Sequence, residues 1–511
     1  MTRHAHLLTL LTLLTPSAAQ QIGTIPELHP QLPTQLCKTS GGCTTRRTSL
    51  VTDALSRSFH AAGNPSVSCN TSPINATLCP DAATCAKNCV LEGVDYGSIG
   101  VSARGAALTL RQYLFDGAAY ASVSPRVYLL AEDGLNYEGL KLLGQELTFD
   151  VDLSRLGCGM NGALYLSEMD LSGNRGDLNP AGAAYGTGYC DAQCFRVGWI
   201  NGMVSSPLMQ GQPLSWSKRT YADEKGQPNL NNSGACCNEM DIWEASSVAT
   251  VYTPHVCSKP SSFLCTGAEC DRTAAGSGVC DKNGCGINTY NLGAQRFYGQ
   301  GLTIDTSKPF TVVTQFLTSD NTTTGTLTEI RRLYVQGGRV IPSTSETTNT
   351  GVAGIPGGYK GTITQDYCSV RNASDFNRLG GLAGMGASLA RGMVLIFSIW
   401  NSPGDFMSWL DSGNNGPCNA TEGDPKLIVE RTPDVSVTFS NIRWGDIGST
   451  FSASSAAGVD GGGGPTQEGA VAGSKVITAA ESGAGSVREA GVGGTTAAVV
   501  GFVALLGLLL S

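Results

Sequence analysis

Three carboxylates lie within six positions of this chain, at Glu239, Asp241 and Glu244. They directly follow the adjacent pair Cys236-Cys237. In an extended strand side chains alternate between two faces, so Glu239 and Asp241 share one face and Glu244 falls on the other. One extra residue after Asp241, accommodated as a β-bulge, returns Glu244 to the first face. A helix would turn Glu239 and Glu244 about 140° apart. The spacing therefore indicates a bulged strand that presents three acids together, and the plain alternative is an exposed acidic edge strand.

Such a cluster is costly, because close carboxylates repel and raise one another's pKa. Chemistry that needs one acid protonated and another ionised would justify that cost. Glycosidic bond cleavage has this requirement: one carboxylate attacks the anomeric carbon, while the other protonates the leaving oxygen and later activates water. In the retaining form the two carboxyl groups lie about 5–5.5 Å apart, so one bent strand can supply both.

The ends of the chain and its cysteines indicate export. Residues 1–19 combine Arg3, an apolar run over residues 7–14 and small residues at Ser17 and Ala19, which is typical of a secretory signal peptide. All 18 cysteines lie between Cys37 and Cys418, and an even number in an oxidising compartment predicts disulfides. Six Asn-x-Ser/Thr sequons fit the same compartment: Asn70, Asn75, Asn231, Asn321, Asn372 and Asn419.

Composition also excludes several classes of partner. Cys-x-x-Cys pairs do not recur, and the histidines left after signal cleavage are His29, His60 and His255, so we expect neither a metal site nor a cofactor. The net charge of −8 argues against nucleic acid or anionic lipid as a partner. A neutral polymer remains possible, and we expect a monomer.

The segments that must position the acids have the sequence pattern of β-strands. Residues 20–451 form one cysteine-bearing unit without a low-complexity break, rich in short alternating segments and turns. The run over residues 393–400 is apolar throughout, which predicts a strand at the centre of a sheet. A helix is predicted near residues 376–390. The other strand-like segments are residues 107–110, 126–130, 146–153, 310–316 and 435–439.

The composition changes after residue 451. Residues 452–494 are rich in Gly, Ala, Ser and Thr and predict a flexible stalk. The apolar end at residues 495–511 is short for a spanning helix, and small residues at 482–486 precede it after a spacer. This arrangement is typical of a glycosylphosphatidylinositol (GPI) signal, with a transmembrane anchor as the alternative. We therefore expect an extracellular protein attached to the outer cell surface through its lipid alone.

The acidic segment resembles the catalytic strand of glycoside hydrolase family 7, the fungal-type cellulases, in its Glu-x-Asp-x-x-Glu pattern after a Cys-Cys pair. Further stretches are similar and occur in the family's order: residues 78–89, 158–165, 185–194, 253–255, 408–413 and 439–450. The resemblance implies an all-β, concanavalin-like β-jelly-roll sandwich of two curved antiparallel sheets with long, disulfide-tied loops. It also implies a cleft for a cellulose or β-1,4-glucan chain and retaining hydrolysis of that chain.

The resemblance assigns roles residue by residue. Glu239 would be the nucleophile and Glu244 the general acid/base, while Asp241 would hydrogen-bond Glu239. His255 would tune Glu244 or a leaving-group-side sugar, with a structural histidine as the alternative.

Aromatic and polar residues would bind the substrate. Trp400 and Trp409 match platforms on which sugar rings stack. The polar positions that match the cleft lining are Asn161, Tyr165, Gln193 and Arg126. Core packing is predicted for Trp199, Trp243 and Trp444, and Trp216 stays undecided.

The family's disulfide pattern pairs every cysteine. It ties the catalytic strand through Cys190–Cys237 and Cys194–Cys236. The remaining implied pairs are Cys37–Cys43, Cys69–Cys89, Cys79–Cys85, Cys158–Cys418, Cys257–Cys280, Cys265–Cys270 and Cys285–Cys368.

The loops indicate how the substrate is cut. Residues 411–424 resemble the short endoglucanase version, and Asn291 stands where processive members carry an arginine. Ser56 and Ser58 lie where aromatics are usual, whereas the long segments 217–235 and 257–285 favour a partly roofed cleft. We expect an endo-β-1,4-glucanase, with a cellobiohydrolase or a wall-remodelling transglycosylase as alternatives. The intact acids argue against a non-catalytic glycan-binding protein.

Overall fold

The computed structural model describes residues 21–69, 75, 77–80, 82–194, 199–200, 203–204, 233–270, 278–343, 352, 354–355 and 359–452. Several predictions fall outside these residues: the signal peptide, the stalk beyond residue 452, the C-terminal signal, most of segment 217–235, Trp216, the side chain of Trp199, and the sequons at Asn70 and Asn231. Within this described part of the chain, no helix is long and apolar enough to cross a membrane.

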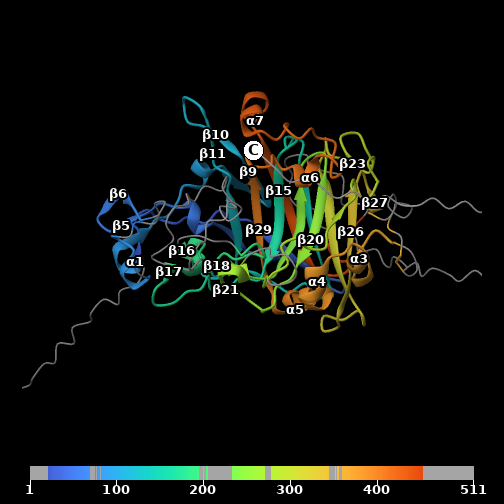
Figure 1. Ribbon diagram of the computed structural model, residues 1–511, viewed down its shortest axis with the longest axis horizontal. Coiled ribbons are helices and arrows are strands. Elements are labelled where there is room, and N and C mark those ends of the chain that lie inside the picture. Colours follow the sequence, from blue (N-terminus) through green and yellow to red (C-terminus); the bar gives the residue numbers. More distant parts are fainter. Residues whose placement is uncertain are drawn as a thin grey trace, which may run out of the picture. The chain divides into compact units, whose positions relative to one another are not determined.

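Two large sheets pack face to face and confirm the predicted β-sandwich. One sheet, the site sheet, is antiparallel in the order β22-β20-β19-β15-β29-β12-β4, with β13 also paired to β29 (Figure 1). Its strands are β4 (Ser49–Thr52), β12 (Arg126–Leu130), β13 (Gly139–Leu140), β15 (Asn161–Ser167), β19 (Glu239–Ala245), β20 (Thr250–His255), β22 (Ile287–Asn288) and β29 (Met393–Trp400).

The second sheet runs in the order β27-β26-β25-β14-β30-β2-β3, with β28 paired to β26, β9 paired to β30, and β8 paired to β9. Its strands are β2 (Thr34–Lys38), β3 (Gly42–Arg46), β8 (Val101–Arg104), β9 (Ala107–Arg111), β14 (Gln145–Asp152), β25 (Phe310–Thr318), β26 (Leu327–Gln336), β27 (Arg339–Pro342), β28 (Ile363–Thr364) and β30 (Ser436–Asp446). All six segments predicted as strands are strands of these two sheets.

Helices are few and short. The predicted helix near residues 376–390 is found as α4 and α5. The described helices are α1 (Ala82–Asn88), α3 (Gln365–Val370), α4 (Ser374–Arg378), α5 (Gly381–Arg391), α6 (Ser408–Asp411) and α7 (Pro425–Arg431).

Strand β29 shows why the site sheet is rigid. Leu395, Phe397 and Ile399 belong to the large core between the sheets. Val394 and Ile396, which alternate with them, belong to a second apolar cluster on the other face. A strand covered on both faces has no solvent side to fill with polar residues, which explains the unbroken apolar run. The catalytic-strand candidate β19 lies two places away, separated only by β15.

Candidate active site

Strand β19 contains the predicted bulge. Against β20 the register shifts between Asp241 and Glu244, so two residues of β19 oppose one residue of β20. A matching shift occurs against β15. Ile242 and Trp243 are consecutive, yet both belong to the core between the sheets, as a bulge allows. The acids are left on the opposite face, which is the arrangement that the spacing predicted.

The carboxylate of Glu239 is buried among other charged groups. Its Oε2 accepts a hydrogen bond from the backbone N–H of Ala192 at 3.0 Å. Burial raises the pKa of Glu239 well above its usual range, and the nearby carboxylates of Asp241 and Asp191 raise it further. The charge of His255 and the Ala192 N–H act in the opposite direction. The ionisation of Glu239 is thus set by burial and two acids, which raise its pKa, against one imidazolium and one amide, which lower it.

Asp241 and His255 form a buried ion pair. His255 Nε2 lies 3.0 Å from Asp241 Oδ2. Its Nδ1 lies 2.9 Å from the carbonyl oxygen of Asp281. Burial alone would lower the pKa of His255, but the hydrogen bond and charge of Asp241, with the charges of Glu239 and Asp281, raise it to about 10. Both ring nitrogens therefore donate, as in an imidazolium.

These contacts differ from what the resemblance implied. It implied a hydrogen bond from Asp241 to Glu239 and a place for His255 beside Glu244. In the structure Asp241 binds His255, and His255 pairs in register with Glu239, whereas Glu244 pairs with Val251. Val251 and His255 are four residues apart along β20, a separation of about 13 Å in an extended strand. Asp241 therefore acts on Glu239 through its charge, and His255 belongs to the Glu239 end of the site.

Glu244 is held by Asn161 of β15. Asn161 Nδ2 donates to Glu244 Oε1 at 2.9 Å, and its Oδ1 accepts the N–H of Ala245 at 3.1 Å. Because Asn161 Oδ1 accepts the Ala245 N–H, the amide nitrogen of this fully buried side chain faces the Glu244 carboxylate. Asn161 is also the register partner of Trp400 on β29. Asn161 thus orients the proposed acid/base and lies opposite a proposed sugar platform on the neighbouring strand.

A row of side chains crosses the sheet beside Glu244. The register places Ala163 opposite Glu244, Ser398 opposite Ala163, and Arg126 opposite Ser398. Ala163 and Ser398 have small side chains, so they leave space on this face of the sheet between Glu244 and Arg126. Arg126 itself is 1% exposed and donates through Nε to Asp53 at 2.9 Å. Its contact with substrate remains a prediction.

Tyr165, Tyr189 and Asp191 form a buried hydrogen-bonded chain next to Glu239. The hydroxyls of Tyr165 and Tyr189 lie 3.2 Å apart, and the Tyr189 hydroxyl donates to Asp191 Oδ2 at 2.8 Å. The other oxygen of Asp191 is buried and has no hydrogen-bond partner among the residues that the structure describes. The guanidinium of Arg126 stacks 3.2 Å from the centre of the Tyr189 ring. Sequence reasoning gave no role to Tyr189, Asp191 or the Ala192 amide, although they lie in the stretch 185–194 that it singled out.

The two candidate platform aromatics lie together. Trp400 ends β29 and Trp409 is in α6, and their rings stack with centroids 6.2 Å apart and planes at 27°. Trp409 is 38% exposed and offers an open ring surface. By contrast Trp243 and Trp444 are buried in the core, as predicted.

Gln193 fastens one loop to another. Its Nε2 donates to the Lys282 carbonyl at 2.9 Å, and Lys282 Nζ donates to the Gln193 carbonyl at 2.9 Å. The loop that carries the Ala192 amide is therefore tied to the segment between β21 (Phe263–Thr266) and β22. The adjacent Asp281 carbonyl contacts His255, so the tie lies at the Glu239 end of the site.

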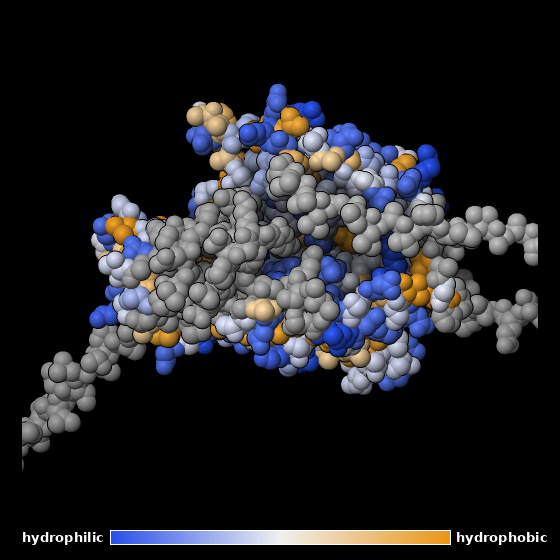
Figure 2. All heavy atoms as spheres, in the orientation of Figure 1, coloured by the Kyte–Doolittle hydropathy of each residue, from blue (hydrophilic) through white to orange (hydrophobic). Residues whose placement is uncertain are grey.

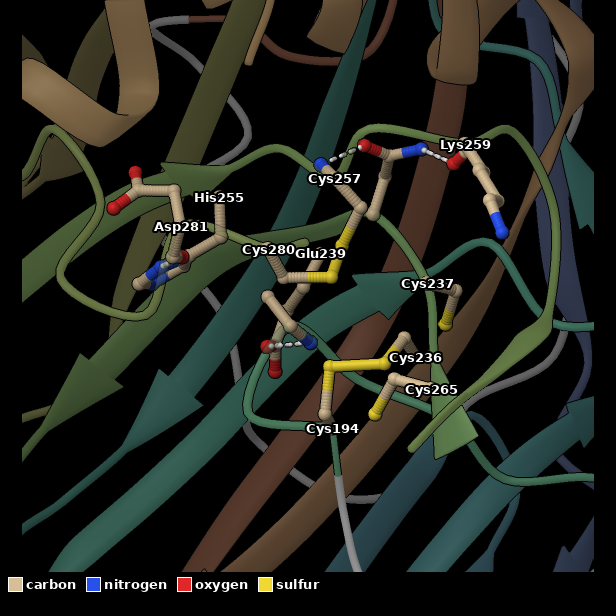
Figure 3. Close-up of a disulfide and its surroundings, with 12 residues drawn as sticks. Cys194, Cys236, Cys237, Glu239, His255, Cys257, Lys259, Cys265, Cys280 and Asp281 are labelled. Atoms are coloured by element: carbon tan, nitrogen blue, oxygen red, sulfur yellow. Dashed lines mark hydrogen bonds between the residues drawn. A yellow bond between two sulfur atoms is a disulfide. The ribbon is translucent and has the colours of Figure 1, made fainter. Parts of the chain in front are cut away.

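Disulfides clamp the start of β19. Cys190–Cys237 and Cys194–Cys236 join the two cysteines before Glu239 to the segment that carries Ala192. Figure 3 shows the Cys194–Cys236 bridge beside Glu239, with Cys257–Cys280 next to it. All nine implied pairs are present. The adjacent pair therefore fixes the backbone of both Glu239 and its amide donor.

Three groups of cysteines lie close enough together to suggest metal ligation. They are Cys69, Cys79 and Cys89; Cys194, Cys236 and Cys280; and Cys158 and Cys418 with Glu422. Every one of these cysteines is in a disulfide, so none offers the thiolate that a metal requires.

Comparison with known proteins gives a family match over the whole described unit. The model of the family described as glycosyl hydrolase family 7 matches residues 22–451. A protein of Aspergillus terreus named "Probable endo-beta-1,4-glucanase celB" is 56% identical over 442 residues, which cover 86% of this chain and 97% of that protein.

Solved structures agree. The native endocellulase EGI of Humicola insolens superimposes with a TM-score of 0.73 at 44% identity, over 84% of this chain and 100% of that one. A family 7 cellobiohydrolase of Daphnia pulex gives a TM-score of 0.74 at 34% identity over the same shares. The fold is thus common to both kinds of enzyme, while the sequence is more similar to the endocellulase.

Proposed function

This chain belongs to glycosyl hydrolase family 7, and we propose that it is an endo-β-1,4-glucanase that cleaves internal bonds of cellulose or a related β-glucan with retention of configuration. It is a glycoside hydrolase, as its family membership shows. The observation that carries the proposal is the bulge in β19, which brings Glu239 and Glu244 onto one face of one strand. There each carboxylate has its own partner, Ala192 for Glu239 and Asn161 for Glu244.

In the proposed first step Glu239 attacks the anomeric carbon while Glu244 gives its proton to the leaving glycosidic oxygen. The carbon–oxygen bond to the leaving chain breaks, and a glycosyl ester forms on Glu239. Attack requires Glu239 to be ionised, although burial and two acids oppose this. The His255 imidazolium and the Ala192 N–H supply the opposing stabilisation.

In the second step Glu244, now a carboxylate, removes a proton from a water molecule that attacks the same carbon. The ester bond breaks, Glu239 leaves as a carboxylate, and Glu244 regains its proton. Asn161 Nδ2 donates to Glu244 Oε1 and would stabilise the charged form between the steps. Two inversions at one carbon give net retention.

Internal cleavage is favoured over processive action from chain ends. Asn291 stands at the position where processive members carry an arginine. Its Nδ2 donates at 3.0 Å to Oδ1 of Asn415, which belongs to the short 411–424 segment. Relatives at high identity carry endoglucanase names, including the Aspergillus terreus protein and an Endoglucanase EG-1 of Hypocrea jecorina at 47% identity.

We further propose that the enzyme is exported and held at the outer cell surface by a GPI anchor. Nine disulfides suit an oxidising compartment. The sequence of residues 1–19 and 482–511 supplies the two signals. Release from membranes by phosphatidylinositol-specific phospholipase C tests this, and retention after treatment would favour a spanning helix.

The activity is tested with carboxymethylcellulose and soluble cello-oligosaccharides. A steep fall in viscosity with few new chain ends supports internal cleavage, and cellobiose alone with constant viscosity overturns it. Proton NMR of the first product should show the β-anomer, because retention preserves the β linkage. Products longer than the starting sugar would instead favour transglycosylation. The Glu239→Gln variant is the control for contaminating activity.

A further inference from the structure

An arginine of the second sheet lies in the apolar core. Arg332 belongs to β26, shares its core face with Ile330 and Tyr334, and is fully buried. Figure 2 shows hydrophilic residues over much of the described surface, where charged side chains are solvated. By contrast Nε and Nη1 of Arg332 are buried and have no hydrogen-bond partner among the described residues. Burial of a charge with so few partners costs folding free energy, so packing alone would favour an apolar side chain at this position.

The contacts of Arg332 include every residue of the bulge in β19. At the bulge Ile242 and Trp243 oppose a single residue of β20, Tyr252. Nη2 of Arg332 donates a hydrogen bond to the carbonyl oxygen of Ile242. The guanidinium carbon lies 4.3 Å from the centre of the Tyr252 ring and 5.6 Å from the ring of Trp243, both within the range of a cation–π contact. One side chain thus contacts all three residues that form the bulge.

Ile242 is the residue at which both strand ladders are interrupted. It is the residue of β19 that has a register partner on neither β15 nor β20. A bulge leaves its extra residue unpaired, and a buried carbonyl oxygen without a strand partner needs another donor. Arg332 supplies that donor from the opposite sheet. The bulge is therefore held from the core side by a residue about 90 positions away in the sequence.

The bulge lies between the two proposed catalytic acids. Glu239 comes before it and is also fixed by the Ala192 N–H and by the disulfides at the start of β19. Glu244 comes directly after it, so a change in the bulge displaces Glu244 more than Glu239. We propose that Arg332 is a positioning residue that holds the bulge and thereby places Glu244 for proton transfer to the leaving oxygen; this rests on the proposed β-glucanase function.

The test replaces the arginine with methionine, an unbranched side chain that fills the space but cannot donate a hydrogen bond (Arg332→Met). We expect kcat on cello-oligosaccharides to fall about 10- to 100-fold with little change in KM, because small misplacements of a catalytic group have effects of this size. Aryl cellobiosides with good leaving groups need little acid assistance, so their kcat/KM should change much less. The ratio of kcat/KM on the two substrates therefore measures the placement of Glu244.

Ile330→Ala is the matched control. Ile330 lies two residues before Arg332 on the same face of β26, is fully buried, and pairs with Phe316 and Ile363 rather than with the bulge. The control should lower the free energy of unfolding, measured with denaturant, and leave the substrate ratio unchanged. If Arg332→Met also lowers stability and leaves the ratio unchanged, Arg332 serves the fold alone and the proposal is overturned. Equal losses on both substrates overturn it as well.

A failure of the proposed function would be visible in the wild type, which would then hydrolyse no β-1,4-glucan, and the positioning role would fail with it. An active wild type with an unchanged ratio in the variant overturns the positioning role alone. If Arg332→Met does not fold, Arg332→Gln decides, because its side chain removes the charge and is two bonds too short to reach the Ile242 carbonyl. The ratio should again fall about 10- to 100-fold, and an unchanged ratio overturns the proposal.

Discussion

His255 Nε2 lies 3.0 Å from Asp241 Oδ2, and the same histidine pairs in register with Glu239. A positive charge is thereby fixed next to Glu239, the carboxylate that we propose as the nucleophile. Two negative groups, Asp241 and Asp191, act on that carboxylate from other directions. Replacing these charged residues one at a time should shift the pKa of Glu239, upward when the positive group is removed and downward when a negative group is removed.

His255→Asn should move the acidic limb of the pH profile of kcat/KM to higher pH. The imidazolium lowers the pKa of Glu239, so its removal raises that pKa and a higher pH is needed to ionise the proposed nucleophile. Initial rates on a soluble cello-oligosaccharide across the pH range measure this. An acidic limb that stays in place would mean that His255 has a structural role only.

The same variant should lose a pH-dependent part of the stability. The pKa of His255 is raised to about 10 in the folded protein, above its ordinary value of 6.5. Its contribution to the free energy of unfolding is therefore complete below about pH 6.5 and is lost as the pH rises through about 10. Denaturant unfolding at several pH values should give a slope over this window in the wild type that is flattened in His255→Asn.

Asp191→Asn should move the acidic limb in the opposite direction, to lower pH. The Asp191 carboxylate raises the pKa of Glu239, and an amide in its place carries no charge. The substitution is conservative, since the Tyr189 hydroxyl keeps an oxygen acceptor and the amide nitrogen replaces an oxygen that has no partner in the described part of the chain. A shift in the same direction as that of His255→Asn would contradict this electrostatic account.

Asn161→Ala should lower kcat/KM on cello-oligosaccharides by about 10- to 100-fold. It removes a hydrogen bond to a carboxyl group, which is worth about 1.5–3 kcal/mol when charged. Aryl cellobiosides with good leaving groups need less acid assistance, so glycosylation of these substrates should fall much less. An equal loss on both substrates would show that Asn161 does not act through Glu244.

Removing the Cys190–Cys237 disulfide by serine substitutions should lower the free energy of unfolding by about 2–5 kcal/mol. Activity should also fall at temperatures where the protein is still folded, because the bridge holds Glu239 near its amide donor. The matched control removes Cys37–Cys43, which joins β2 to β3 in the other sheet. The control variant should lose stability and keep its activity per folded molecule. Equal losses of activity in both variants would show that the Cys190–Cys237 bridge does not position Glu239.

The sequence alone was enough to predict the local structure. Strand-like segments located β9, β12, β14, β25 and β30, and an unbroken apolar run located β29. The spacing of Glu239, Asp241 and Glu244 predicted a bulge because only one extra residue brings all three to one face. The resemblance to the family gave all nine disulfides, and the family match over residues 22–451 confirms it.

The partners of the acids could not be predicted in this way. The register between β19 and β20 places His255 opposite Glu239, and nothing in the local pattern of either strand fixes that register. Asp191 and the Ala192 amide reach Glu239 only because two bridges fold their segment against β19.

Types and spacings of residues within one strand thus determined which acids stand together, since a strand's geometry repeats with every second residue. Tertiary structure decided how each acid is charged. Burial and the distances to groups from distant segments control that charge, and those distances exist only once the sheets, loops and disulfides have come together.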